Sequence, residues 1–210
     1  MIAQGTDEWH LMRLGKVTGS RVAELMAKTK SGESSSRKNY MMELLCQRLT
    51  GKRVELFATQ AMQRGTDLEP IARSCYEAAT GIMVREASFV FHSTIMPFGA
   101  SPDGFVGDDG LLEIKCPNTA QHVEFLTNRK PDGKYIWQMH AQMACTGRMW
   151  CDFVSFDDRM PDALQYACVR VNADKEKLVE LEKEVVRFLE ELDSLESKMK
   201  NLIIGDNHVL

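Results

Sequence analysis

Four short apolar runs in the middle of the chain restrict its fold more than any other feature. They lie at residues 88–91, 98–100, 104–106 and 111–116, and they are rich in residues that favour β-strands. Gly107-Asp108-Asp109-Gly110 separates the last two runs and is typical of a hairpin connection. The runs therefore predict a sheet on which the rest of the chain has to pack.

Helical and strand-like segments continue on both sides of this region. Helical spacing of apolar residues occurs at residues 9–27 (two short pieces), 40–50, 66–80, 120–127 and 135–145, and strand-like runs occur at residues 150–156 and 165–171. This alternation predicts an α/β fold, with a central mixed β-sheet flanked by helices. With 210 residues, 44% of them hydrophobic, the chain can bury one substantial core, so we expect a single domain over residues 1–210.

Residues 173–202 predict a long amphipathic helix at the C-terminal end. Their apolar residues alternate steps of three and four, a pattern that suits a seam against another helix. A long helix laid on the protein's own sheet would need the same apolar stripe. A subunit contact, a partner protein or the core could each use this stripe, and the pattern leaves these arrangements open.

Composition and charge exclude some classes of protein. The N-terminus has no basic segment followed by an apolar run, and no apolar stretch approaches the length of a bilayer-spanning helix, so we expect a cytoplasmic protein without a membrane partner. Six scattered cysteines, without a CxxC pair or a Cys/His cluster, favour reduced thiols over zinc or iron–sulfur sites. The net charge of −4 argues against a polyanionic partner only until divalent cations bind, because they reverse the local sign.

Residues that can carry chemistry lie on both sides of the hairpin. Ser101-Pro102-Asp103-Gly104 precedes it, and Glu113-Ile114-Lys115 follows it. On a strand, Glu113 and Lys115 would project from one face, roughly 6.5 Å apart, while Ile114 enters the core. The alternative is an acidic turn followed by an exposed glutamate and lysine on an edge strand.

This arrangement suits hydrolysis of a phosphodiester bond. The attacking water must lose a proton near neutral pH and the leaving oxygen must gain negative charge, and two divalent cations roughly 3.5–4 Å apart can serve both needs. Asp103 and Glu113 are candidate ligands, since Mg²⁺ prefers carboxylate, carbonyl and water oxygens. Lys115 would orient or deprotonate the water or stabilise the transition state, and the sequence leaves these roles open.

A third carboxylate and two amides lie within predicted helices. Glu69 would complete a site for two cations, although Thr66-x-x-Glu69 also has the spacing of a helix capping box. Gln138 and Gln142, one turn apart, could hold the attacking water or the lysine, or they could be ordinary exposed glutamines. His140 between them is interpreted as a structural histidine.

Near the N-terminus, Arg13 precedes a hydroxyl-capped helix start at Thr18-Gly19-Ser20. Arginine side chains and helix N-termini both bind phosphate. Plain capping and a solvated surface are the alternatives.

Five sequence segments, in their order along the chain, resemble one family of nucleases. They are Trp9-His10-x-x-Arg13-Leu14-Gly15-x-x-Thr18-x-Ser20, Gly65-x-x-x-Glu69, Ser101-Pro102-Asp103-Gly104, Glu113-Ile114-Lys115-Cys116-Pro117 and Gln138. Together they resemble the family of bacteriophage lambda exonuclease and the YqaJ-type viral recombinases, within the PD-(D/E)xK nucleases. The resemblance runs from residue 9 to the C-terminal helix.

This resemblance implies a restriction-endonuclease-like core and a specific activity. The expected enzyme is a processive, ATP-independent 5′→3′ exonuclease that degrades one strand of double-stranded DNA from a free end and leaves a 3′ single strand. A homotrimeric ring threaded by DNA and a single-strand annealing protein as recombination partner are also implied.

The resemblance further assigns roles to residues of the catalytic centre. Asp103, Glu113 and the Ile114 backbone carbonyl would hold one Mg²⁺, and Glu69 with Asp103 would hold the second; Mn²⁺ could substitute. Lys115 and Gln138 would act on the water.

The remaining roles that the resemblance implies concern contacts with DNA. Arg13, Ser20 and Ser101 match the pocket that grips the 5′-phosphate, and Met62 matches an apolar wedge that splits the duplex. Residues 28–39, with four serines and four basic residues, predict a mobile basic loop. Its candidate contacts to DNA phosphates are Lys28, Lys30, Arg37 and Lys38.

Two other functions remain open from the sequence. An endonuclease or a RecB-like nuclease could use the same core, and a catalytically silent DNA-binding module could retain that core as a scaffold. All four central residues are present: Glu69, Asp103, Glu113 and Lys115. This disfavours the silent module, because carboxylates that no longer bind a metal ion repel one another and give the fold no packing advantage.

Overall fold

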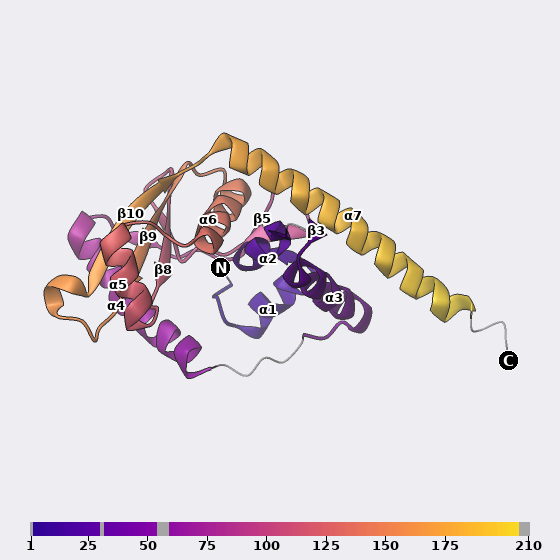
Figure 1. The fold of residues 1–210 in the computed structure, drawn as a ribbon, viewed down its shortest axis with the longest axis horizontal. Coiled ribbons are helices and arrows are strands. Elements are labelled where there is room, and N and C mark those ends of the chain that lie inside the picture. Colours follow the sequence, from indigo (N-terminus) through magenta and orange to yellow (C-terminus); the bar gives the residue numbers. More distant parts are fainter. Residues whose placement is uncertain (1, 30–31, 54–58, 206–210) are drawn as a thin grey trace.

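The computed structural model describes residues 2–29, 32–53 and 59–205. The helices are α1 Asp7–Arg13, α2 Val22–Met26, α3 Ser35–Thr50, α4 Gln60–Thr80, α5 Thr119–Asn128, α6 Gly133–Thr146 and α7 Lys175–Gly205. The strands are β1 Val17–Thr18, β2 Lys28–Thr29, β3 Gly32–Glu33, β4 Val84–Arg85, β5 Val90–Phe91, β6 Phe98–Ala100, β7 Gly104–Val106, β8 Gly110–Lys115, β9 Trp150–Phe156 and β10 Tyr166–Asn172. The predicted α/β class is confirmed (Figure 1).

The central sheet is mixed, as predicted, and has the strand order β10-β9-β8-β7-β4. β7 and β8 form the predicted hairpin through residues 107–110, whereas β8 and β9 are parallel. A parallel pair requires a crossover connection, which α5 and α6 provide. A second, smaller sheet of order β1-β6-β5 was not predicted as a separate unit, because β1 and β5 contain only two residues each.

Helices cover both faces of the central sheet (Figure 1). On one face, Leu68, Ala72 and Tyr76 of α4 pack in one cluster with Leu112, Ile114 and Val154 of the sheet. On the other face, the cluster contains Phe125 of α5, Met139 and Met143 of α6, and Leu111, Cys151 and Phe153 of the strands. β8 is buried on both sides, so polar groups on this strand are shielded from solvent.

The long helix α7 packs against other helices of the chain. Its buried residues Leu181, Val185 and Phe188 belong to a cluster with residues of α2, α3 and α6. The apolar seam of α7 is therefore internal along this part of the helix. α7 packs mainly on helices and not on the central sheet, although Phe98 and Ala100 of the smaller sheet belong to the same cluster. Towards its end the helix runs beyond the body of the protein (Figure 1), where Leu202 is 61% exposed. Within the described residues, no helix is both long and apolar enough to cross a membrane.

Part of the predicted basic loop at residues 28–39 is helical. Ser34 accepts a hydrogen bond from the Arg37 N–H, and α3 begins at Ser35. A serine at this position satisfies a helix N–H that would otherwise lack a partner. Lys28–Thr29 and Gly32–Glu33 form a short antiparallel pair just before it. The prediction of a loop was wrong for residues 35–39, because the first turn of α3 contains only polar residues and has no apolar periodicity that would indicate a helix.

A buried carboxylate joins α4 to the far strands of the sheet. The Tyr76 hydroxyl donates to Asp152 Oδ2 at 2.8 Å, and Arg170 contacts both Asp152 oxygens at 2.8 and 2.9 Å. We expect Tyr76→Phe to lower the free energy of unfolding by about 1.5–3 kcal/mol, since a hydrogen bond to a buried charge is lost. Urea denaturation measures this change. A loss below about 0.5 kcal/mol would mean that Arg170 alone satisfies Asp152.

Candidate active site

The Glu113 carboxylate lies at the centre of the site and is fully buried. Its Oε1 lies 2.6 Å from Gln138 Nε2 and 2.5 Å from Lys115 Nζ, while its Oε2 accepts a hydrogen bond from Gln142 Nε2 at 2.5 Å. A buried charge needs such partners, because desolvation without them is costly. The alternative of an exposed glutamate on an edge strand is wrong, since β8 lies between β7 and β9.

Asp103 lies in the turn before β7 and is tied to β8 by the backbone. Its Oδ2 accepts a hydrogen bond from the Ile114 N–H at 2.6 Å. Burial, together with the carboxylates of Glu113 and Glu69, raises the pKa of Asp103 well above its ordinary value. Lys115 opposes this shift but does not cancel it.

The Ile114 carbonyl lies on the same side of β8 as Asp103. An extended residue directs its N–H and C=O to one side of the strand, and the Ile114 N–H faces Asp103. The last residue pair between β7 and β8 is Gly104 with Leu112. The Ile114 carbonyl lies past this pair, so β7 does not pair with it. The side chain of Ile114 enters the core, as predicted.

Glu69 lies in the middle of α4, which begins at Gln60 with Thr59 as its cap. The capping-box interpretation of Thr66 and Glu69 is therefore wrong, and Thr66 donates instead to the Met62 carbonyl. Arg73, four residues later, donates to Glu69 Oε1 at 3.0 Å and to the Asp103 carbonyl at 2.9 Å. Arg73 was not predicted as a site residue, although its spacing from Glu69 places the two on one helix face.

Lys115 leaves the sheet at the end of β8, next to Glu113. Desolvation lowers the pKa of Lys115, but the Glu113 and Asp103 carboxylates outweigh it and the net pKa is raised. Its ammonium group also lies 5.3 Å from the centre of the Tyr135 ring. Glu113 and Lys115 thus project from the same face of β8, as expected.

The amides of α6 face the carboxylate rather than the solvent. Gln142 is 1% exposed and donates a hydrogen bond to Glu113. The only sequence signal for this contact was that Gln142 lies one helical turn after Gln138. His140 is structural, as interpreted: it contacts the Ile136 carbonyl at 2.7 Å and accepts a hydrogen bond from the Asp174 N–H.

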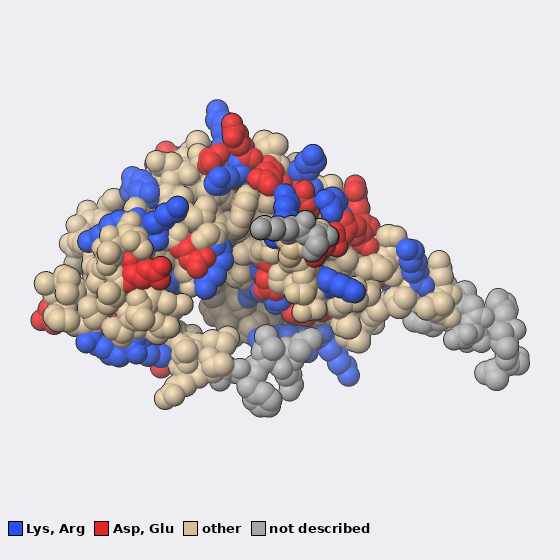
Figure 2. Space-filling model, in the orientation of Figure 1, with Lys and Arg blue, Asp and Glu red and all other residues tan. Residues whose placement is uncertain are grey.

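A basic cavity lies beside this centre, between α1, α3 and the start of α4. Arg13, Ser20 and Met62 all line it, together with His10, Lys16, Arg21 and Arg53. Figure 2 shows a hollow in the middle of this face, with basic and acidic side chains near its border. Burial, with Arg53 and Arg21, lowers the pKa of Arg13 to about 10. Arg21 pairs with Glu43, which also lines the cavity. Arg13 and Arg53 repel each other, and this repulsion favours a bound anion.

Trp9 links the basic cavity to the carboxylates. Arg13 stacks over the Trp9 ring at 3.8 Å and lies 3.4 Å from Ser20 Oγ. The Trp9 indole N–H donates to Ser101 Oγ at 3.0 Å, and Ser101 precedes Asp103 by two residues. The structure thus groups Arg13, Ser20 and Ser101. Trp9 itself was not predicted to position them.

The basic residues proposed outside the cavity have different environments. Arg37 is buried, with ion pairs to Glu33 and Glu191 at 2.8 Å, so its guanidinium is committed to the fold and does not support a contact with DNA. Lys28 is exposed and pairs with Glu180 at 3.2 Å, and Lys38 is exposed on α3. Lys30 lies outside the described residues.

The donor set of the centre suits a hard divalent cation. Among the described residues, no three His, Cys, Asp or Glu side chains already form a metal-binding group, and protein donors engage Glu69, Asp103 and Glu113 instead. All the candidate ligands are oxygens, which Mg²⁺ prefers. The Glu113 and Glu69 carboxylates also contribute to the raised pKa of Asp103, so negative charges lie close together in this centre.

Comparison with known proteins identifies the family. The profile of the YqaJ-like viral recombinase domain matches residues 8–149, a segment that contains Arg13, Glu69, Asp103, Glu113 and Lys115. The chain belongs to the YqaJ-like viral recombinase family. No curated protein matches the sequence.

Solved structures share the fold of this YqaJ-like protein. An alkaline exonuclease from Laribacter hongkongensis, LHK-Exo, is 53% identical, with a TM-score of 0.90 over 95% of this chain and 99% of that chain. A complex of LHK-Exo with dAMP gives the same values. A phage-related exonuclease from Haemophilus somnus 129PT, 17% identical, has a TM-score of 0.72 over 88% of this chain and 96% of that chain, and it shows the fold alone.

Proposed function

We propose that this YqaJ-like protein is a DNA exonuclease that acts in recombination. It would be a Mg²⁺-dependent, ATP-independent and processive enzyme that hydrolyses one strand of duplex DNA from a free end, in the 5′→3′ direction. The link from Arg13 through Trp9 to Ser101 carries this proposal, because it joins a cavity lined by several basic side chains to the carboxylate centre, and such a cavity could hold a phosphate. Similarity to the alkaline exonuclease LHK-Exo supports the proposal.

The short connection between the two sites favours attack near a strand end. Ser101 and Asp103 are two residues apart, a span of at most about 7 Å. A terminal 5′-phosphate held by Arg13, Ser20 and Ser101 would therefore bring the next phosphodiester bond to Asp103. An endonuclease has no use for such a pocket, since an internal bond carries no terminal phosphate.

In the proposed mechanism, oxygen ligands from three elements would hold Mg²⁺. Asp103, Glu113, the Ile114 carbonyl and Glu69 would form this set. Bound Mg²⁺ supplies an acidified water and neutralises charge on the leaving oxygen. Gln138 would orient the attacking water, and Lys115 would stabilise the charge that develops on the attacked phosphate or hold the proton of the water. Glu113 stays buried and keeps these two side chains in place through its hydrogen bonds.

The product of this reaction would be a 3′-ended single strand. A single-strand annealing protein is the expected partner, and a homotrimer around the duplex is the expected assembly. Met62, 57% exposed at the mouth of the basic cavity, would separate the strands as an apolar wedge.

Digestion of linear duplex DNA in Mg²⁺ tests the proposal. We expect shortening of the 5′-ended strand, with mononucleotides as products, and no reaction in EDTA. Addition of Mn²⁺ after EDTA treatment should restore cleavage. Closed circular DNA is the control: its cleavage would favour an endonuclease or a RecB-like nuclease on the same core, and binding without any cleavage would favour a silent DNA-binding module.

The role of Arg13 gives a separate prediction. Arg13→Gln should reduce the preference for 5′-phosphorylated over 5′-hydroxyl linear duplex about 10- to 100-fold, since charge-assisted hydrogen bonds to the phosphate are lost. Initial rates on the two substrates measure this ratio. Arg85→Gln, an exposed arginine outside the cavity, is the matched control. An unchanged ratio in Arg13→Gln would place the phosphate elsewhere.

A further inference from the structure

A second cavity begins at Lys115, and its other lining residues have no role in the function proposed above. Phe125 of α5, Tyr135 of α6 and Phe153 of β9 line it with Lys130 and Lys134. It shares no lining residue with the basic cavity of Arg13. Across β8 and β9, Phe153 pairs with Glu113 and Ser155 with Lys115, so this cavity continues directly from the catalytic centre along the sheet.

One wall of this second cavity is aromatic and well fixed. The Phe125 and Phe153 rings meet edge to face at 5.2 Å, and the Tyr135 ring lies 5.4 Å from Phe153. Both phenylalanines are buried, and Tyr135 is half-buried. Such a wall can accept a flat, largely apolar group without reorganisation.

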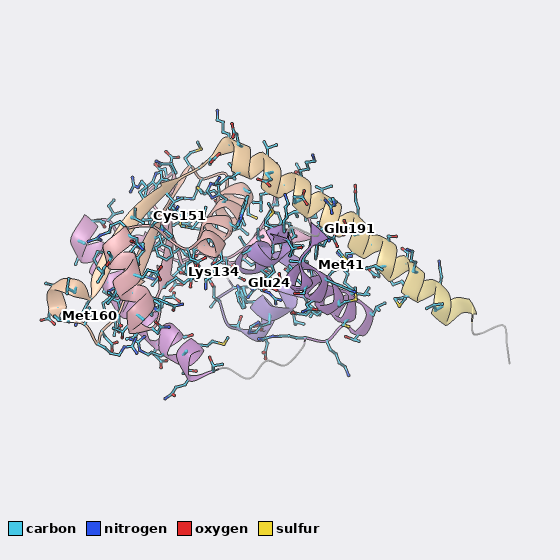
Figure 3. The ribbon with its side chains drawn as sticks, in the orientation of Figure 1. Glu24, Met41, Lys134, Cys151, Met160 and Glu191 are labelled. Atoms are coloured by element: carbon cyan, nitrogen blue, oxygen red, sulfur yellow. The ribbon has the colours of Figure 1, made fainter. Side chains whose placement is uncertain are left out.

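The cavity is also lined by two lysines, Lys130 and Lys134. Lys130 and Lys134 are exposed, and within residues 59–205 neither forms an ion pair. Lys134 lies at the start of α6 (Figure 3), with its ammonium group 4.8 Å from the centre of the Tyr135 ring. Of the two carboxylates that line the cavity, Asp132 caps α6 through the Lys134 N–H, and Glu124 is exposed. Two ammonium groups without an ion pair among the described residues are therefore available to bind an anion here.

A flat apolar group joined to an anion describes a nucleotide. We propose that this cavity receives the second nucleotide of the strand being degraded, an inference that rests on the proposed function. The terminal nucleotide would lie between the Arg13 cavity and Lys115, with the attacked phosphate at Lys115. The strand must then continue past Lys115, where the cavity begins. The base would contact the aromatic wall, and the following phosphate would contact Lys130 and Lys134.

Two modified substrates test this assignment. Both are 5′-phosphorylated linear duplexes, one with an abasic tetrahydrofuran unit at nucleotide 2 of the 5′ strand and one with that unit at nucleotide 6. Release of the first nucleotide in a single turnover is measured. The wild-type protein should cleave the first duplex about tenfold more slowly than the unmodified duplex, as expected for loss of one base–aromatic contact. The unit at nucleotide 6 should have no such effect.

Variants separate this contact from an indirect effect on Lys115. In Tyr135→Ala, the tenfold difference at nucleotide 2 should disappear, because the unmodified duplex is slowed to the rate of the abasic one. In the wild-type protein, a methylphosphonate between nucleotides 2 and 3 should slow the reaction, because it removes the charge that Lys130 and Lys134 contact. The same change should slow Lys134→Ala less, since one of the two lysines is already absent, whereas the matched control Lys198→Ala should respond as the wild-type protein does. Thermal unfolding checks that each variant is folded.

The possible results distinguish this inference from the proposed function. If the wild-type protein cleaves the unmodified duplex and both abasic duplexes at equal rates, the second-nucleotide site is overturned and the exonuclease stands. The same conclusion follows if Tyr135→Ala slows all substrates by one factor, since Tyr135 then acts through Lys115. If no linear duplex is cleaved at all, the proposed function fails and the inference fails with it.

Discussion

Glu113→Gln and Lys115→Ala should each reduce cleavage of linear duplex DNA by about 10³-fold or more, with the fold retained. Glu113→Gln keeps the shape of the side chain but removes the negative charge that would bind the cation. Lys115→Ala removes the only ammonium group within 4 Å of Glu113 in the described structure. Initial rates in Mg²⁺ measure both losses.

A second measurement shows whether these losses come from the site itself. Glu113→Gln should weaken Mn²⁺ binding in calorimetry, whereas Lys115→Ala should retain it. Asp108→Asn, in the exposed turn of the β7–β8 hairpin, is the matched control and should behave as the wild-type protein in both assays. Retention of cleavage within tenfold in Glu113→Gln would overturn the assignment of this carboxylate.

Phe188→Ala should lower the free energy of unfolding by about 3–5 kcal/mol, the largest change in stability that we expect from one substitution. Phe188 is fully buried in α7, where its ring stacks on Tyr40 at 5.6 Å and lies 5.1 Å from the Arg37 guanidinium. Alanine leaves a cavity between α7 and α3 that rigid neighbouring elements cannot fill. Chemical denaturation monitored by circular dichroism measures the loss.

An exposed residue of the same helix provides the control. Val179→Ala, at a side chain that is 66% exposed, should change stability by about 0.5 kcal/mol at most. Similar losses in the two variants would mean that α7 contributes through helix propensity and not through its packed face. The cluster of Phe188 contains none of the carboxylates Glu69, Asp103 and Glu113, so cleavage below the unfolding transition should be retained in Phe188→Ala.

Local sequence patterns predicted the elements of the sheet better than the starts of the helices. β9 was predicted at residues 150–156, and these are its bounds in the structure. By contrast, α4 begins at Gln60 and not at Thr66. Gly65-Thr66 resembled a helix start, but one glycine inside a helix costs only about 1 kcal/mol. The Thr59 cap and the good helix formers after it outweigh that cost.

The sequence by itself determined the central residues of the candidate site. Asp103, Glu113 and Lys115 are close along the chain, and strand periodicity is enough to place the last two on one face. The hairpin between β7 and β8 is also a local property, because turn residues and alternating apolar residues specify it.

Only the tertiary structure decided which distant residues meet. Trp9 and Ser101 are 92 positions apart, and their hydrogen bond joins the basic cavity to the carboxylates. Arg37, basic and in a polar segment, is buried because α7 folds back over α3 and supplies Glu191. Local propensity acts over a few residues, whereas burial and long-range pairing depend on how complete elements pack.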